Sequence, residues 1–176
     1  MCIRDRLKIC TDITGRTDAY ITYGTAVGEQ IDQILRAVSA DQKEQKRILF
    51  IRAGSKASAT KAKTAQDNFV CMMLQDLGAY NIAENAPVLL DGLSLEEIIT
   101  EDPDYIFIST MGDEQAAKTY LESVFAQEAW QHLSAIEQGR YTFLPKDLFQ
   151  FKPNARWAQA YQYLADLLCL EQDGIS

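Results

Sequence analysis

Short continuous runs of apolar residues alternate along most of this chain with segments that repeat apolar residues every three or four positions. The runs lie at 47–51, 79–82, 105–109 and 140–144. Each is followed by a segment with the periodicity of an amphipathic helix. Continuous rather than alternating apolar runs indicate strands that are buried on both faces. The predicted fold class is therefore α/β, a three-layer αβα lobe with a mainly parallel four-stranded sheet.

A long helix is predicted before the first strand. Between Thr17, its expected N-cap, and Ser39, apolar residues recur at helical spacing: Tyr20, Tyr23, Val27, Ile31, Ile34 and Val38. A shorter helix over 7–14 is expected to end at Gly15, because glycine suits the left-handed backbone that follows a helix. Later helices are predicted at 62–77, at 95–100 with Ser94 as its cap, at 114–126, and at 155–168 with Asn154 as its cap.

The charge balance limits the class of partner. The chain has 176 residues with 17 Lys and Arg against 25 Asp and Glu, a formal net charge of −8. An acidic surface argues against nucleic acid or an anionic membrane as the main partner. The composition, 47% hydrophobic and 24% charged, is that of a globular domain, and no stretch has the length and hydropathy of a membrane-spanning helix.

Residues with the chemistry of a metal or catalytic site are sparse. Cys2, Cys10, Cys71 and Cys169 include no pair at the spacing of a zinc knuckle, and His132 is the single histidine. A buried thiol in a helix is the ordinary interpretation of Cys71 and Cys169. We therefore predict no resident cofactor, no metal site and no enzymatic activity.

The loop after the first predicted strand superficially resembles a phosphate-binding loop. It contains Gly54 before Ser55 and Lys56, but the phosphate-loop pattern requires a second glycine before the lysine. Ser55 and Lys56 are adjacent, with no third group to orient them as nucleophile and base. This loop therefore predicts neither nucleotide binding nor catalysis.

Basic and aromatic residues gather where the predicted strands end. In a parallel sheet these carboxyl ends share one edge, and ligands bind beyond it. The residues are Arg52, Lys56, Lys61, Lys63, Lys146, Phe149, Phe151, Lys152 and Arg156. Any one of these lysines is typical of a solvated surface, but together they predict a cationic, aromatic-lined rim for an anionic or metal-chelate ligand.

Five segments, in this order, resemble ABC-importer substrate-binding proteins of the iron–siderophore, haem and cobalamin type (class III periplasmic binding proteins). GRTD at 15–18, with the helix after it, is similar to the helix that bridges the two lobes of that family. DPDYIFISTMGD at 102–113 resembles a strand region of the C-terminal lobe, and WQHLSAIEQGR at 130–140 a run before its last strand. LPKDLF at 144–149 and KPNARW at 152–157 resemble the segment that leads into the final helix.

This resemblance implies how the chain is organised. Residues 1–15 would be the end of a missing N-terminal lobe or a truncation scar, 16–40 the bridging helix, and 46–170 the C-terminal ligand-binding lobe. The first six residues carry charges and no apolar stretch, so no signal peptide is predicted within this chain. The family implies an extracytoplasmic protein, here N-terminally truncated, that meets the membrane only through a lipid anchor absent from this chain.

The resemblance also implies a function. The protein would capture an iron–siderophore, haem or cobalamin between two lobes and deliver it to the permease of an ABC importer. By loop position, the ligand-facing residues are predicted to be Arg52, Lys61, Met111, Lys146 and Phe149. In the family a glutamate of each lobe meets permease arginines, and the segment 94–98 makes Glu96 the candidate. A glutamate in the first turn of a helix is equally explained by the helix dipole.

Two alternatives remain open at the level of sequence. A lobe of a metallocluster oxidoreductase would need cluster-ligating cysteines in strand-end loops, and the predicted positions of Cys71 and Cys169 disfavour it. A small stand-alone α/β interaction domain is disfavoured because the long helix over 17–39 has an apolar face that nothing upstream covers.

Overall fold

The computed structural model describes residues 3–41, 45–150 and 155–169. Contacts divide the chain into two compact units. We call residues 43–150 the sheet unit, and residues 1–42 with 151–176 the helical unit. This division differs from the predicted lobe over 46–170, because the last helix groups with the long helix and not with the sheet.

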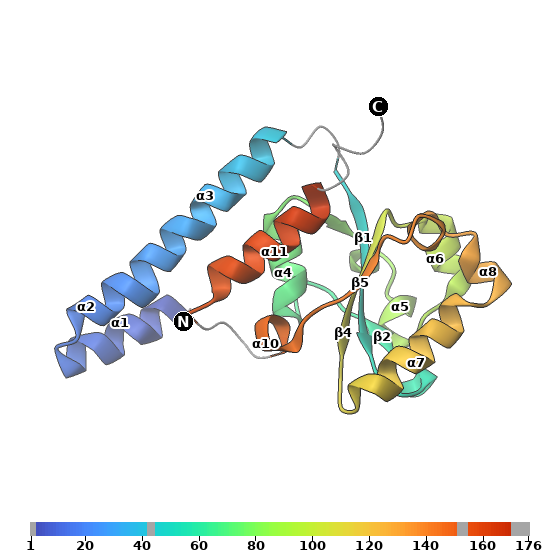
Figure 1. Ribbon diagram of the computed structural model, residues 1–176, viewed down its shortest axis with the longest axis horizontal. Helices are drawn as coiled ribbons and strands as arrows, with labels where there is room; N and C mark the ends of the chain where they lie inside the picture. The colour runs from blue at the N-terminus through green and yellow to red at the C-terminus, as the bar shows by residue number, and fades with distance from the viewer. Residues whose placement is uncertain (1–2, 42–44, 151–154, 170–176) are drawn as a thin grey trace. The chain divides into compact units, whose positions relative to one another are not determined.

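The sheet unit is built on a mainly parallel sheet, as predicted (Figure 1). Its strands are β1 (Arg47–Ala53), β2 (Lys61–Ala62), β3 (Tyr80–Asn81), β4 (Tyr105–Thr110) and β5 (Tyr141–Phe143). β1 pairs in parallel with β4, and β4 with β5. The other edge of β1 is shared: its first half pairs in parallel with β3 and its second half antiparallel with β2. All four predicted strands are present, and β2 is an addition.

Helices cover both faces of this sheet. In Figure 1, α4 (Phe69–Asp76) and α10 (Lys146–Phe149) lie on one face. The other face carries α5 (Val88–Asp91), α6 (Leu95–Glu101), α7 (Glu114–Phe125), α8 (Glu128–Gln131) and α9 (Ser134–Glu137). The short turns η2 (Ala57–Ala59) and η3 (Ile82–Glu84) follow β1 and β3.

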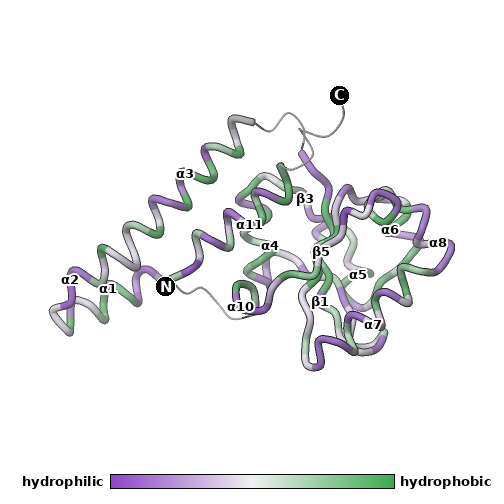
Figure 2. The backbone as a smooth tube through the Cα atoms, in the orientation of Figure 1, coloured by the Kyte–Doolittle hydropathy of each residue, from purple (hydrophilic) through white to green (hydrophobic). Residues whose placement is uncertain are grey.

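Successive side chains of a strand point to opposite faces of the sheet, and a hydrophobic core lies on each face. Leu49, Ile51 and Ala53 of β1 belong to one buried cluster with Leu121 of α7 and Trp130 of α8. Ile48 and Phe50, which alternate with these residues along β1, are equally buried and point to the opposite face. Figure 2 shows hydrophobic residues along the strands at the centre of this unit. Burial of both faces explains the continuous apolar runs in the sequence.

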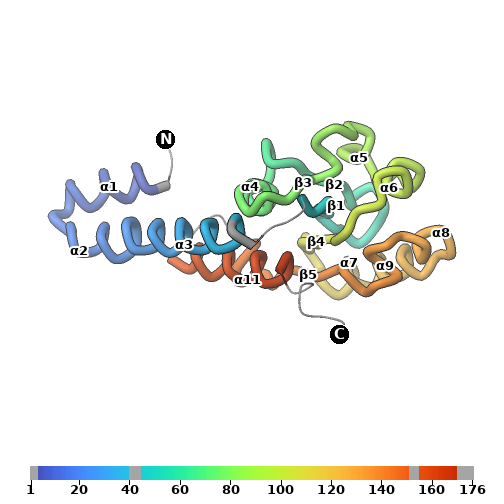
Figure 3. Tube along the Cα trace, turned by 90° about the horizontal axis from the view of Figure 1, so that it is seen from above, coloured from blue at the N-terminus to red at the C-terminus, as the bar shows by residue number. Residues whose placement is uncertain are grey.

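The helical unit consists of α1 (Ile3–Thr14), α2 (Thr17–Tyr20), the π-helical segment η1 (Ile21–Thr25), α3 (Ala26–Asp41) and α11 (Trp157–Cys169). The continuous helical path from residue 17 to 41 confirms the predicted long helix. α11 packs alongside α3, as Figures 1 and 3 both show. Gly15 has φ +68°, as expected for the residue after a helix. In the described part of the chain, no helix has the length and apolar character needed to span a membrane.

Several predicted helix ends were wrong. The helix predicted at 62–77 begins only at Phe69, because residues 61–62 form β2 and the Asn68 side chain accepts a hydrogen bond from the Val70 N–H as the N-cap. Arg16, not Thr17, occupies the cap position of α2, and its side chain makes no cap hydrogen bond. Ser94 does precede α6 but makes no side-chain cap bond. The predicted cap Asn154 lies outside the described residues.

An ion pair holds the turn between β2 and α4. Lys63 Nζ lies 2.6 Å from a carboxylate oxygen of Asp67, and the Thr64 N–H donates to the other oxygen at 3.1 Å. Burial raises the pKa of Asp67, but these hydrogen bonds and the charges of Lys63 and Arg52 outweigh it. The net pKa of Asp67 therefore lies below its ordinary value, so the folded state favours the carboxylate.

Replacement Asp67→Asn should destabilise the fold at neutral pH only. A carboxylate with a depressed folded pKa contributes stability above its unfolded pKa, about 3.9, and loses it as the pH falls through the folded pKa. Because Asp67 is partly exposed, we expect a loss of no more than about 1 kcal/mol at pH 7, shrinking below about pH 4. Urea unfolding of both proteins between about pH 3 and pH 7 measures this difference in unfolding free energy. Asp91→Asn, at an exposed carboxylate of α5, is the control, and equal pH profiles for the two variants would contradict the assignment.

Replacement Gly54→Ala should destabilise the loop that follows β1. A Cβ at Gly54 would lie 2.5 Å from the Ala59 Cβ and 2.9 Å from the Ala59 carbonyl oxygen. Overpacking of this kind costs about 1–3 kcal/mol of unfolding free energy. Gly92→Ala is the matched control, because Gly92 has an extended backbone and no atom within 4 Å of such a Cβ. A urea midpoint of Gly54→Ala equal to that of the control would show that the loop relaxes freely.

Candidate functional site

The carboxyl ends of β1, β4 and β5 form one edge of the sheet, and three loops leave from it. The Met111 N–H donates to the Ala53 carbonyl at 2.8 Å, and the Leu144 N–H donates to the Ile108 carbonyl at 2.7 Å. These bonds continue the parallel ladders one residue past the strands. The loops after the three strands therefore start side by side, which is the arrangement that the sequence predicted.

Thr60 closes the loop after β1. Its buried hydroxyl accepts from the Gly54 N–H at 3.1 Å and lies 3.2 Å from the Gly54 carbonyl and 3.1 Å from the Lys56 carbonyl. The Gly54 N–H is thereby used within the loop, which removes a donor that a phosphate-binding loop would offer. Sequence reasoning missed Thr60, because a threonine at this distance from a glycine forms no known motif.

Arg52 and Lys61 stand directly opposite each other across the antiparallel pair of β1 and β2. Cross-strand partners point to the same face, so the two cationic side chains are neighbours. Both residues are half-buried. Within the described residues, neither makes a side-chain hydrogen bond or an ion pair, although the charge of Arg52 helps to lower the pKa of Asp67.

Lys63 is the third cation of this edge, but it is already neutralised. It lies two residues beyond Lys61, and its ammonium group pairs with Asp67 at 2.6 Å. The Cys71 thiol and the Asn81 amide both hydrogen-bond to the Lys63 carbonyl, which fixes the backbone there. The unbalanced charge of this region therefore belongs to Arg52 and Lys61.

Met111 and Lys146 lie at the ends of the neighbouring strands. Met111 directly follows β4 and is 50% exposed. Lys146 is the first residue of α10, and its Nζ lies 3.3 Å from the Gly112 carbonyl oxygen and 3.5 Å from Glu114 Oε2. The structure thus brings Lys146 to the loop after β4, as the prediction requires, but it also supplies a carboxylate partner.

The other predicted residues lie in different surroundings. Phe149 is only 3% exposed, so its ring is part of the interior and presents little surface to a ligand. Glu96 is exposed in the first turn of α6. Arg156 is exposed in the helical unit, and Phe151 and Lys152 lie outside the described residues.

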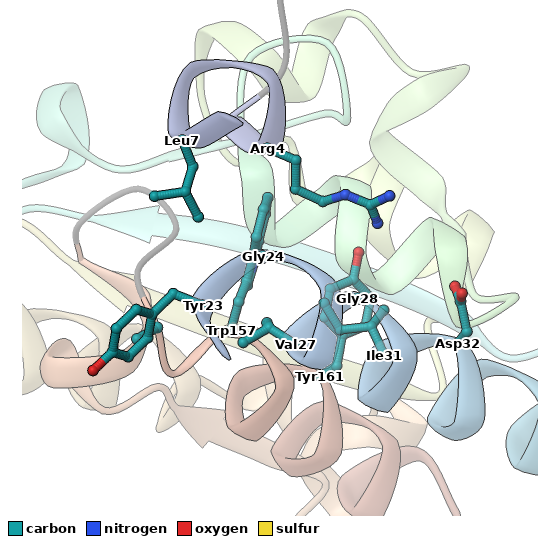
Figure 4. A pocket seen from close by; sticks show the side chains of 11 residues that line it. Arg4, Leu7, Tyr23, Gly24, Val27, Gly28, Ile31, Asp32, Trp157 and Tyr161 are labelled. Atoms are coloured by element: carbon teal, nitrogen blue, oxygen red, sulfur yellow. The ribbon is translucent and has the colours of Figure 1, made fainter. Parts of the chain in front are cut away.

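Each of the two units has a cavity whose lining includes none of the predicted ligand-facing residues. In the helical unit a cavity of about 320 Å³ is lined by apolar side chains that include Leu7, Val27 and Trp157, with Arg4 and Asp32 as its charged groups (Figure 4). In the sheet unit a shallow cavity of about 400 Å³ lies among η2, the link from α5 to α6, α7 and α8. The candidate site is therefore an open edge of the sheet rather than an enclosed pocket.

The described cysteine and histidine residues do not form a reactive or metal-binding group. Across residues 3–41, 45–150 and 155–169, no three His, Cys, Asp or Glu side chains gather as metal ligands would. Burial raises the pKa of the Cys71 thiol far above its ordinary value, which keeps it protonated and unreactive. His132 is exposed.

Solved structures with the same fold come from transport systems. An ABC transporter substrate-binding protein from Listeria monocytogenes EGD-e matches with 16% identity and a TM-score of 0.76, over 94% of this chain and 62% of that chain. S. aureus IsdE complexed with haem matches with 16% identity and a TM-score of 0.77, over 95% and 64%. An ABC-type Fe3+-hydroxamate transport protein from Saccharomonospora viridis DSM 43017 matches with 12% identity and a TM-score of 0.70, over 95% and 55%.

These identities support the fold alone, and the chain spans about three fifths of the length of the first two structures. No curated protein matches the sequence significantly. Residues 3–148, however, match the family described as "Periplasmic binding protein". This match covers most of the sequence and confirms the resemblance inferred from its motifs. The chain belongs to the periplasmic binding protein family.

Proposed function

We propose that this chain is the C-terminal part of an extracytoplasmic receptor that captures a metal chelate for an ABC importer. The ligand class is an iron–siderophore, haem or corrinoid, and no bond is made or broken. The observation that carries the proposal is the cation pair Arg52 and Lys61, which has no ion-pair partner among the described residues and lies where β1 ends. Family membership and the haem and Fe3+-hydroxamate proteins among the similar structures support the same class.

The cation pair is unfavourable unless an anion joins it. Like charges directly opposite in an antiparallel pair destabilise the sheet. Half-burial increases this repulsion, because the surrounding dielectric constant is lower than that of water. An anionic group between the two side chains would remove the repulsion and add charge-assisted hydrogen bonds. The pair is therefore suited to binding an anion and not to stabilising the fold.

The rest of the edge favours an amphipathic ligand over a simple inorganic anion. Met111 places a polarizable, half-exposed thioether at the end of β4, beside the strand that carries Arg52. A haem or siderophore combines carboxylate, catecholate or hydroxamate oxygens with a large apolar surface. Cations on β1 and β2 would hold the oxygens of such a ligand while Met111 contacts its apolar part.

A single lobe presents only one side of a ligand. We infer that the complete receptor contains a second lobe, as the longer similar structures suggest, and that the isolated chain binds weakly or not at all. Attachment to the membrane would be through a lipid anchor outside this chain, and delivery would be to permease subunits. Glu96, exposed at the start of α6, is the proposed contact with permease arginines.

Removal of the two cations should weaken chelate binding. In the complete receptor, Arg52→Gln with Lys61→Gln is expected to reduce affinity for haemin or ferric enterobactin by at least about 10-fold, because charge-assisted contacts to an anion are lost. Tryptophan fluorescence quenching measures this affinity. Lys46→Gln, at the amino end of the same strand, should change it less than about 2-fold.

Two results would count against this function. One is a wild-type receptor that binds none of haemin, ferric enterobactin, ferrichrome and cyanocobalamin. The other is equal affinity for the anionic chelates with and without Arg52 and Lys61.

Charge reversal at Glu96 should block delivery without changing capture. The chelate-loaded receptor carrying Glu96→Lys is expected to lose about 10-fold or more of its stimulation of the importer's ATPase in proteoliposomes, because an arginine contact becomes a repulsion. Chelate affinity should stay within about 2-fold of wild type. Glu97→Lys, one residue further on the same helix, is the matched control. Equal loss of stimulation in both variants would assign the effect to general charge and not to Glu96.

A further inference from the structure

Lys146 is a predicted rim cation that, like Lys63, has a direct acidic partner in the described structure. Its Nζ lies 3.5 Å from Glu114 Oε2 and 3.3 Å from the Gly112 carbonyl oxygen. Glu114 is in the first turn of α7, directly beyond the loop that follows β4. The contact therefore joins the loop after β4 to the helix after β5.

Glu114 has a second, closer partner. Its Oε1 lies 2.7 Å from Lys118 Nζ, one helical turn further along α7. Lys118 in turn lies over the Phe143 ring, 5.6 Å from its centroid, at the end of β5. If Lys146 leaves Glu114, the carboxylate keeps Lys118, so separation of the pair leaves no unpaired charge behind.

The neighbouring carboxylate, Asp113, has a structural role as a helix cap. Asp113 is the N-cap of α7, and its side chain accepts from the Ala116 N–H at 3.0 Å. The side chains of Lys146 and Glu114 are 27% and 43% exposed, so a ligand arriving at the sheet edge has access to both. The longer of the two Glu114 contacts is the one made with a predicted rim residue.

We propose that Glu114 is an internal counter-ion that competes with the ligand for Lys146 and so limits the preference of the site for anionic over neutral chelates. The inference rests on the proposed function and deepens it. A chelate with clustered negative charge displaces Glu114 from Lys146, whereas a neutral chelate leaves the pair intact and gains nothing from this lysine. Glu114 thereby lowers affinity for anionic chelates that use Lys146 and leaves affinity for a neutral chelate unchanged.

Removal of the carboxylate should strengthen binding of anionic chelates. In the complete receptor, Glu114→Gln is expected to raise affinity for ferric enterobactin by roughly 2- to 10-fold, the range set by exchange of an exposed ion pair. Affinity for ferrichrome, a neutral chelate, should not change. Glu122→Gln removes the same charge from the far end of α7 and should have less than about 2-fold effect. Unchanged or weaker enterobactin binding by Glu114→Gln would overturn the proposal.

A double-mutant cycle separates competition for Lys146 from simple repulsion of the ligand. With Lys146→Gln already present, Glu114→Gln should lose its effect and behave like Glu122→Gln. A gain in affinity of the same size with and without Lys146 would show that Glu114 merely repels the anion, and the proposal would fail.

The ion pair itself can be tested without any chelate in the 176-residue chain. Carbon-13 NMR of the Glu114 carboxyl should show its titration midpoint rising in Lys146→Gln, because one of the nearby cations that lower the pKa of Glu114 is lost. No shift would overturn the inference whatever the ligand is. A shift without chelate binding by the complete wild-type receptor would instead refute the proposed function, and the competition with it, while the ion pair stands.

Discussion

The parallel pairing of β1 with β4 is the constraint on which the candidate site depends. The ladder runs in register from Ile48 opposite Tyr105 to Ala53 opposite Thr110, and it is buried on both faces along most of its length. A slip of one residue would turn Phe50 and Ile51 to the wrong faces and leave apolar side chains without a partner layer. The same register brings the loops after β1 and β4 to a common edge. Packing of the core thus determines where a ligand can be held.

The edge of β1 that β2 and β3 share determines which charged side chains lie next to each other. Its first half pairs with β3 and its second half with β2, and only the antiparallel pairing with β2 sets Lys61 opposite Arg52. The backbone hydrogen bonds and core packing that hold β2 in place, including the buried Ala62, impose this repulsion on the two side chains. A two-residue strand therefore creates the local electrostatic environment that distinguishes this edge from the rest of an acidic molecule.

Sequence reasoning succeeded where burial leaves a periodic signal. Continuous apolar runs such as 105–109 identified the strands, and three-and-four spacing identified the helix from residue 17. The sequence did not predict features that depend on a few neighbouring residues or on contacts between residues far apart in the chain. β2 is too short to show a period, and the cap Asn68 moved the start of α4. The burial of Phe149 depends on how a single helical turn faces the sheet. Glu114 went unnoticed because its partner Lys146 is far along the chain.

The cations of this edge differ in how firmly each is neutralised. Lys63 is the least available to a ligand. Its ammonium group lies 2.6 Å from Asp67, and the Lys63 side chain is only 16% exposed. Lys146 is held by a longer contact to a carboxylate that has a second partner, and Arg52 and Lys61 have no carboxylate within ion-pair distance among the described residues. An incoming anion can therefore bind Arg52 and Lys61 without displacing a carboxylate from an ion pair. To bind Lys146, the anion must compete with Glu114. Lys63, in contrast, contributes to the stability of the turn. The affinity for an anion would then depend mainly on Arg52 and Lys61, and the balance between anionic and neutral ligands on how Glu114 limits access to Lys146.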